Sequence, residues 1–297
     1  MIVRAALLLL PGLMGPALPL VAQGLFYEGG LSVASGVFIF AERTTGWSLS
    51  TGLAAGTRRL TFRATLPVYL QNTSLVSLSG PGGAIPTGGS SSGVVADSGA
   101  ARKGRGGAGG AAGASGMSTR LAQSAVEVPS SALTGYQAAV GDPTVEVSWR
   151  AVDAYRTGVT ISLLAKAPVA DTATFGTGRW DVASRVGLAQ RVSRRLTAGL
   201  EVAYWHLGDL TTLDFRDPIY GTASVGYRGD GGWGGGLTFS AGSSALDGYD
   251  GPVWIGGYAS RGSAGGGWGI NGAVGLSETT PDFTLALSWR VRLLRGP

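Results

Sequence analysis

The sequence predicts an all-β fold: a transmembrane antiparallel β-barrel of about twelve strands, with one long Gly/Ser/Ala-rich outer loop. Only 14% of the 297 residues are charged, whereas a soluble globular domain carries roughly 25%. Mean hydropathy is nevertheless only +0.21. Beyond the N-terminal segment, no apolar run approaches the roughly 20 residues that a membrane-spanning helix needs. Short two-faced strands are therefore the predicted way of crossing a membrane.

The first 24 residues are typical of a signal peptide. Arg4 precedes the apolar run 5–10, and Ala22-Gln23-Gly24 fits a small-x-small cleavage site. A buried N-terminal helix is the alternative, but prolines interrupt the segment and make a long helix costly. Residues 25–297 are expected to form one outer-membrane β-barrel domain.

The strand signal is an alternation of apolar and polar side chains over about ten residues. It is clearest near the end of the chain, where Leu285, Leu287 and Trp289 share one face and Ser288 and Arg290 share the other. Two segments, 31–41 and 253–260, have apolar residues on both faces and are placed by spacing. The expected strands are 31–41, 47–54, 60–71, 145–150, 159–166, 182–192, 196–204, 219–228, 233–241, 253–260, 268–277 and 283–293.

The connections alternate in length, as they do in bacterial outer-membrane barrels. Turns expected on the periplasmic side are short, while most outer connections are longer. The longest, 73–142, contains a stretch of Gly, Ser, Ala and Pro and is expected to be a low-complexity extracellular loop; a plug or a surface sensor is the alternative. Aromatic residues near the strand ends fit two membrane-interface girdles: Trp149, Tyr155, Trp233 and Trp268 at the periplasmic end, and Trp47, Trp180, Tyr204 and Trp205 at the outer end.

The same alternation predicts which charged side chains line the lumen. Cations outnumber anions in this set, and a positive lumen favours anions such as carboxylates. The alternative is that these residues pair across strands and only brace the barrel. The lumen-lining candidates are Arg63, Glu146, Arg150, Lys166, Arg185, Arg191, Glu201, Arg228, Arg290 and Arg292.

Several function classes are disfavoured by composition. The chain has no Cys and one His, so no metal site, cofactor or catalytic residue is expected. The net charge is +5, but the basic residues are dispersed and carry no recognition motif, so no nucleic-acid partner is expected. His206 is the one candidate acid or base. No nucleophile motif accompanies it, which leaves a lipid-modifying enzyme as the weakest hypothesis.

Three motifs resemble one known family. They are Val140-Gly141-Asp142-Pro143-Thr144, the strand end Lys166-Ala167-Pro168, and Phe175-Gly176-Thr177-Gly178-Arg179-Trp180-Asp181. Together they are similar to motifs of the transporter-like outer-membrane barrels of the meta-pathway of phenol degradation. The first motif lacks one glycine of the family pattern, and the C-terminus lacks the usual final aromatic residue. The resemblance implies passive uptake of small, often aromatic or hydrophobic compounds.

The expected function is therefore an outer-membrane channel for passive uptake of small organic compounds, with aromatic and anionic solutes as candidates. A structural or surface-interaction barrel with a plugged lumen is the second hypothesis. The expected partners are outer-membrane lipid, a small-molecule solute and the barrel-assembly machinery. The sequence leaves the oligomeric state open.

Overall fold

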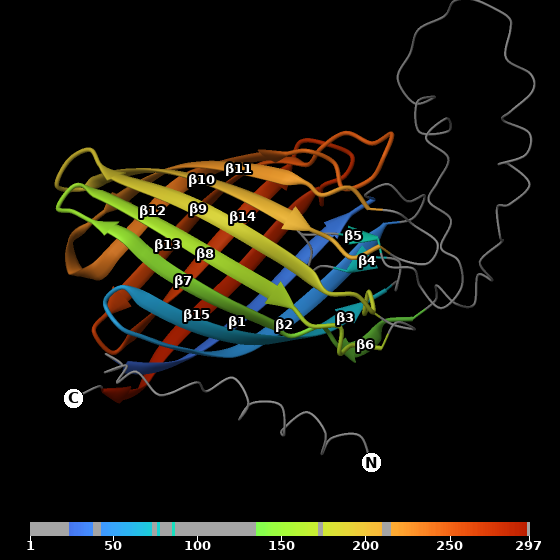
Figure 1. Cartoon of the computed structure of the whole chain (residues 1–297), viewed down its shortest axis with the longest axis horizontal. Coiled ribbons are helices and arrows are strands. Elements are labelled where there is room, and N and C mark those ends of the chain that lie inside the picture. Colours follow the sequence, from blue (N-terminus) through green and yellow to red (C-terminus); the bar gives the residue numbers. More distant parts are fainter. Residues whose placement is uncertain are drawn as a thin grey trace, which may run out of the picture.

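The computed structural model describes residues 24–37, 43–72, 76–77, 85–86, 135–171, 175–209 and 215–295. These residues form a thirteen-stranded antiparallel sheet and a separate two-stranded pair (Figure 1). Residues 1–23 of the expected signal peptide (1–24) and most of the expected 73–142 loop lie outside them. No helix among the described residues is long and apolar enough to span a membrane.

The large sheet closes on itself. Strand β1 pairs with both β2 and β15, and β2 pairs with β3, so every wall strand has two neighbours. With β6 as an extra short strand, the wall contains twelve strands, which confirms the predicted fold class. In chain order the strands are β1 (Gly24–Gly36), β2 (Thr44–Gly56), β3 (Leu60–Gln71), β4 (Val76–Ser77), β5 (Ile85–Pro86), β6 (Gln137–Val140), β7 (Thr144–Asp153), β8 (Thr157–Lys166), β9 (Asp181–Arg191), β10 (Leu196–His206), β11 (Ile219–Arg228), β12 (Trp233–Gly242), β13 (Val253–Ser263), β14 (Gly266–Gly275) and β15 (Phe283–Arg295).

The first strand begins earlier than the sequence suggested. It starts at Gly24 rather than Leu31 and ends at Gly36. The alternation that places Leu31 on the outer face continues backward through Tyr27, and it places Glu28 on the opposite face. The expected position rested on spacing alone, and spacing does not fix the register of a strand whose faces are both partly apolar.

The end of the expected 73–142 loop is itself a strand. β6 pairs with the last residues of β3, and β7 pairs with the residues before them. Between them, residues 141–143 interrupt the ladder opposite Pro67, which has no N–H to donate. The backbone N–H of Gly141 instead donates to the carbonyl of Pro67 at 2.8 Å. This break lets the side chain of Asp142 turn into the barrel, where it is buried.

The connections differ at the two ends of the barrel. At one end, here called the inner end, the strands are joined by the short turns 57–59, 154–156, 192–195, 229–232 and 264–265. The opposite, outer end carries the longer connections, including 167–180, 207–218 and 243–252 (Figure 1). Gly231 and Gly232 have φ values of 67° and 81°, which a side chain would make costly in so tight a reversal. The predicted alternation of short and long connections is present.

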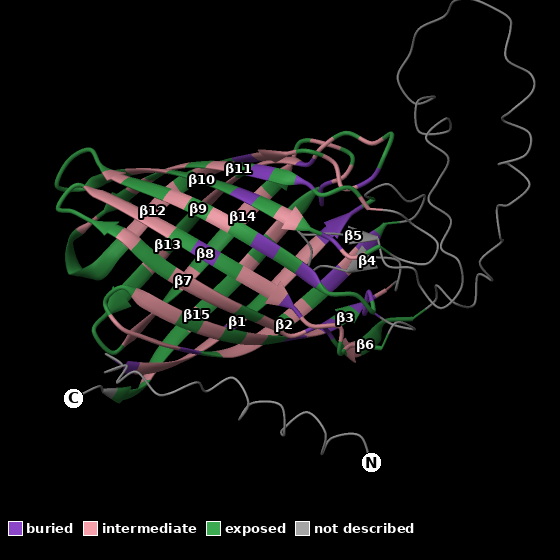
Figure 2. Ribbon diagram, viewed as in Figure 1, coloured by how far each residue is buried: buried purple, intermediate pink, exposed green. Residues whose placement is uncertain are grey.

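The packing is the inverse of that in a soluble protein. Large apolar side chains such as Leu163 and Leu237 are 58% and 66% exposed on the outside of the wall. Figure 2 shows more and less exposed residues alternating along the strands, with buried residues gathered toward the outer end. At the inner end Trp233 and Trp268 contact edge-to-face with ring centres 5.5 Å apart. A closed barrel with an apolar exterior and interfacial tryptophans is suited to lipid.

Candidate functional site: the barrel interior

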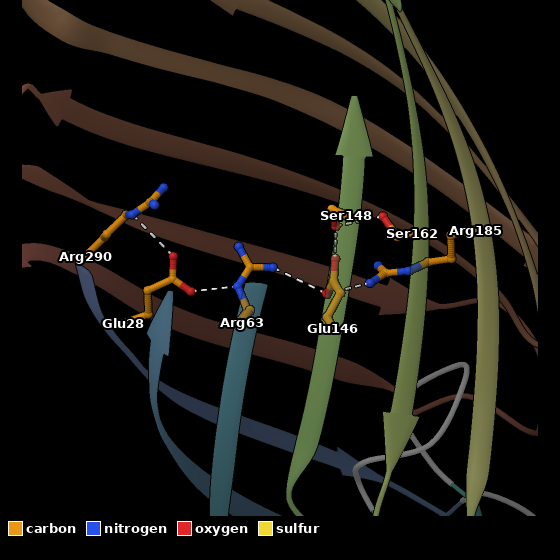
Figure 3. Close-up of polar contacts among 7 residues, drawn as sticks. All are labelled: Glu28, Arg63, Glu146, Ser148, Ser162, Arg185 and Arg290. Atoms are coloured by element: carbon orange, nitrogen blue, oxygen red, sulfur yellow. Dashed lines mark hydrogen bonds and ion pairs between the residues drawn. The ribbon is translucent and has the colours of Figure 1, made fainter. Parts of the chain in front are cut away.

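Charged side chains on the inward face of five strands form one connected row, here called the charge belt: Glu28, Arg63, Glu146, Arg185 and Arg290 (Figure 3). Arg63 Nε lies 2.7 Å from Glu28 Oε2, and its Nη1 lies 3.4 Å from Glu146 Oε2. Arg185 Nη2 lies 2.7 Å from the same Glu146 oxygen. Arg290 Nε lies 3.3 Å from Glu28 Oε1. Each carboxylate is therefore shared by two guanidinium groups.

Small residues on the intervening strands let the belt connect. Arg63 on β3 reaches Glu28 on β1 across β2, whose inward residues there are Gly52 and Ala54. A Cβ at Gly52 would lie 2.5 Å from the carbonyl oxygen of Ala64, so no other residue fits without a shift. On the other side, Ser148 donates to Glu146 Oε1 at 2.7 Å and is itself 2.8 Å from the Ser162 hydroxyl.

The belt carries a net charge of +1, since it contains three arginines and two glutamates. The Arg63 and Arg290 side chains are 40% and 45% exposed, so they remain partly hydrated inside the barrel. The Glu28 and Glu146 side chains are less exposed, at 20% and 14%, so these are partly buried ion pairs in which the cost of desolvation offsets much of the attraction. The belt therefore acts mainly as a fixed pattern of charge facing the interior.

A second group of polar side chains lies near the outer end and is here called the outer cluster: Asp142, Lys166, Thr177 and Asp181. Lys166 Nζ lies 2.6 Å from Asp181 Oδ2 and 3.4 Å from Asp142 Oδ2, and it donates to the Thr177 hydroxyl at 3.0 Å. The Lys166 side chain is only 2% exposed. A buried cation with two carboxylates and a hydroxyl around it is well compensated, whereas any member alone would be costly.

The outer cluster fastens loop backbone over the end of the barrel. Asp142 Oδ1 accepts hydrogen bonds from the N–H groups of Val169 and Ala170 at 3.0 and 2.9 Å. Asp181 Oδ1 accepts one from Gly208 N–H at 3.0 Å. One carboxylate thus holds the β8–β9 connection, and the other holds the start of the β10–β11 connection.

Apolar packing adds to these bonds. Phe175, in the β8–β9 connection, is 1% exposed and meets the ring of Tyr69 edge-to-face at 5.8 Å. Leu207 and Leu246, from two further outer connections, are also buried. Side chains from three outer connections are therefore buried at the outer end of the described wall.

Two cavities lie in the described interior, and the larger extends from the inner end to the middle of the barrel. A cavity of about 780 Å³ is lined by inward residues of β1, β2, β13, β14 and β15, including Phe26, Glu28 and Arg292. A second cavity of about 650 Å³ adjoins it and is lined by β10 to β13, including Arg228 and Tyr258. Both share Ser260, Gly262 and Ser263. Small side chains account for most of this volume.

The ten candidates from the sequence fall into distinct surroundings. Four of them belong to the charge belt, one to the outer cluster, and two line the inner cavities. Of the remaining three, Arg150 lies 3.5 Å from Asp153, and the Arg191 guanidinium lies 5.1 Å from the ring centre of Tyr155. Glu201 makes no ion pair with any residue that the structure describes. The structure therefore brings seven candidates into groups and leaves these three apart.

Sequence reasoning missed several residues of the site. Glu28 was overlooked because the first strand was expected to begin at Leu31. Asp142 and Asp181 were noted in motifs, but their meeting around Lys166 was not foreseen. One feature of the sequence could have indicated the cluster: Asp142 lies just before β7 and Asp181 begins β9, so both acidic residues stand at the outer end of a strand, as Lys166 does.

The only histidine lies at the outer rim. His206 Nδ1 is 3.0 Å from Asp217 Oδ2, and the Tyr204 hydroxyl donates to the same oxygen at 2.6 Å. Desolvation raises the pKa of Asp217, but hydrogen bonds from Tyr204, His206 and the backbone of Leu207 outweigh it, and the pKa lies below its usual value. Among the described residues no Ser or Thr hydroxyl bonds to His206, so the contact resembles a loop anchor.

The fold is similar to that of a solved outer-membrane channel. No protein-family model and no curated protein matches the sequence. The crystal structure of an outer membrane channel from Pseudomonas putida F1 superposes with a TM-score of 0.60 at 13% identity, covering 93% of this chain and 97% of that one. The chain has the fold of an outer-membrane channel. At that identity the likeness shows the fold alone.

Two further solved structures are more distant. The NanC porin has a TM-score of 0.48 at 8% identity, covering 91% of this chain and all of that one. The CymD monoaromatic hydrocarbon channel has a TM-score of 0.48 at 10% identity, and the match covers 93% of this chain and 90% of that one. No conclusion rests on these two. The closed twelve-strand wall and its apolar exterior place the chain among bacterial outer-membrane barrels.

Proposed function

We propose that this protein is a passive channel through which small organic solutes cross the outer membrane. The observation that carries the proposal is the pair of adjoining cavities, about 780 and 650 Å³, inside a closed barrel with an apolar exterior. Twelve strands are intermediate between the filled eight-strand barrel and the wide sixteen-strand porin. The predicted lumen residues and the charge belt would then face the passing solute.

The outer cluster supports a channel whose outer entrance is narrow in the described state. Phe175 and Lys166 are buried at that end, so we infer that passage involves movement of the β8–β9 connection. Loop motions of this kind occur on nanosecond to microsecond timescales or slower. We infer that solute flux is limited at this entrance.

We also propose kinship with the transporter-like barrels of the meta-pathway of phenol degradation. The residues that carry the resemblance, Asp142, Lys166, Phe175, Thr177 and Asp181, meet in or beside the outer cluster. The resemblance favours aromatic compounds among the candidate solutes. The proposal also includes outer-membrane lipid and the barrel-assembly machinery as partners, and it includes no enzymatic step.

Liposome swelling and planar-bilayer conductance test the proposal. The folded wild-type barrel and a Lys166→Met variant, in which the outer end is released, should both pass solutes, and the variant should pass more. Benzyl alcohol and benzoate serve as solutes of similar size and different charge. If neither folded protein shows swelling or conductance, the channel proposal is wrong.

A further inference from the structure

Two cations that line the inner cavities have no acidic partner among the residues that the structure describes. Arg292 lines the larger cavity and Arg228 the smaller one. Within the described part of the chain no carboxylate lies within 4.0 Å of either guanidinium. By contrast, Arg290, two residues from Arg292 on the same face of β15, forms an ion pair with Glu28. The positive charge of Arg292 and Arg228 is therefore not cancelled locally.

Arg292 is also short of a hydrogen-bond acceptor. Its Nε atom is buried and makes no hydrogen bond to any described residue. Its guanidinium lies 5.2 Å from the ring centre of Phe26, over which Arg290 also lies at 3.9 Å. A buried charged donor without an acceptor is costly, and a carboxylate in the cavity would offset that cost by binding the terminal nitrogens of the same guanidinium.

Aromatic surface lies beside both cations. Phe26 lines the larger cavity and Tyr258 lines the smaller one. The Tyr258 side chain lies across strand positions occupied by glycine, since a Cβ at Gly226 or Gly236 would come within 2.8 Å of its ring or hydroxyl. The glycines thus make room for an aromatic ring on the cavity wall.

We propose that Arg292 and Arg228 form two neighbouring binding stations for small aromatic carboxylates at the inner end of the barrel. Each station joins a guanidinium, which can bind a carboxylate through two parallel hydrogen bonds, with an aromatic side chain that contacts the planar body of the solute. The two stations adjoin, because both cavities are lined by Ser260, Gly262 and Ser263. The inference rests on the proposed channel function and adds the solute class.

Binding and conduction can be tested separately on the full-length folded barrel. Saturation-transfer NMR in detergent measures binding of benzoate, with benzyl alcohol as the neutral probe of similar shape. We expect benzoate to bind and benzyl alcohol to bind more weakly. Arg292→Gln should weaken benzoate binding about tenfold or more, the scale of a lost charged hydrogen bond, and Arg228→Gln should weaken it further in the double variant.

Two variants keep the test decisive. Arg292→Lys retains the charge without the planar fork, so it should bind benzoate more tightly than Arg292→Gln but more weakly than wild type. Arg58→Gln removes an exposed arginine of an inner-end turn, 3.1 Å from Asp153, and should leave benzoate binding unchanged. Heat-modifiable gel migration checks that each barrel is folded.

The outcomes separate the two proposals. A barrel that conducts but binds benzoate no better than benzyl alcohol, or that binds it equally well in Arg292→Gln and Arg58→Gln, overturns the stations and leaves the channel standing. A barrel that binds benzoate in detergent through Arg292 but passes no solute in liposomes supports the stations as binding sites and overturns passive passage.

Discussion

Replacing Lys166 with methionine should open the outer end of the barrel. The substitution removes the cation that lies 2.6 Å from Asp181 and 3.4 Å from Asp142, while keeping a side chain of similar length. Both carboxylates, which are 4% and 1% exposed, would then be buried without a counter-charge. Breaking a buried ion pair in this way typically costs about 3 to 5 kcal/mol.

Lys166 and Asp181 face each other at the ends of β8 and β9, but both carboxylates of the cluster also accept hydrogen bonds from loop N–H groups, so we expect the cost to weaken the closed arrangement of the loops. Because each 1.4 kcal/mol is about a tenfold change in an equilibrium constant, the ratio of closed to open outer ends should fall by about two to four orders of magnitude. Single-channel recordings should show longer or more frequent open periods. Hydrogen exchange should show faster exchange at the N–H groups of Val169 and Ala170, which donate to Asp142.

Two further variants show whether charge is the cause. Adding Asp142→Asn and Asp181→Asn to Lys166→Met removes the uncompensated carboxylates, so it should restore part of the closed state. Arg216→Met removes an ion pair with Asp247 in which the two side chains are 63% and 80% exposed. It should change neither the conductance nor the hydrogen exchange. Wild-type conductance and unchanged exchange at Val169 and Ala170 in a folded Lys166→Met barrel would refute the role given to the outer cluster.

Three other predictions follow from the wall, the belt and the rim. Leu287→Arg, on the outward face, should lower the folded yield in lipid vesicles, because an arginine near the bilayer midplane costs about 2 to 4 kcal/mol. Ser288→Arg, on the inward face, should be tolerated. A lower folded yield for Ser288→Arg than for Leu287→Arg would contradict the assignment of the two faces. Glu28→Gln should raise the anion selectivity of the channel, measured as the reversal potential in a salt gradient. It should lower the free energy of unfolding by at most about 1 kcal/mol. An unchanged reversal potential would show that the charge belt does not face the ion path. Because the pKa of Asp217 is lowered in the folded protein, its anchoring of the rim should be complete above pH about 4 and lost as pH falls through the lower folded value. NMR signals of His206 should report this loss, and Asp217→Asn should abolish this transition below pH about 4, leaving only the titration of the imidazole itself.

The wall of the barrel was largely predictable because it rests on local periodicity. The alternation of Leu285, Leu287 and Trp289 with Ser288 and Arg290 fixes strand, register and outward face from sequence alone. The expected strand from Leu31 failed where both faces contain apolar or small residues, since no periodic signal then separates lipid from lumen. Glu28 was lost for that reason.

The outer cluster was not predictable in the same way. Asp142, Lys166 and Asp181 lie in separate segments, and their meeting depends on a break in the β6–β7 strand and on the inward fold of the β8–β9 connection. Alternation places Lys166 on the inward face, but it does not distinguish a hydrated lumen lysine from one that is 2% exposed. The difference comes from loops, whose conformations have no periodic signature.

The inverse packing of the wall has a consequence for what holds the molecule together. In most proteins, water drives apolar side chains inward, and cohesion comes from excluding it. Here side chains such as Leu237 and Leu163 face outward, so burial of apolar surface gives the barrel little internal cohesion. The closed ring of backbone hydrogen bonds between the twelve strands must instead hold the barrel together. The lipid provides the apolar surroundings that a protein core would otherwise provide. The stability of this protein should therefore depend on the thickness and composition of the surrounding bilayer.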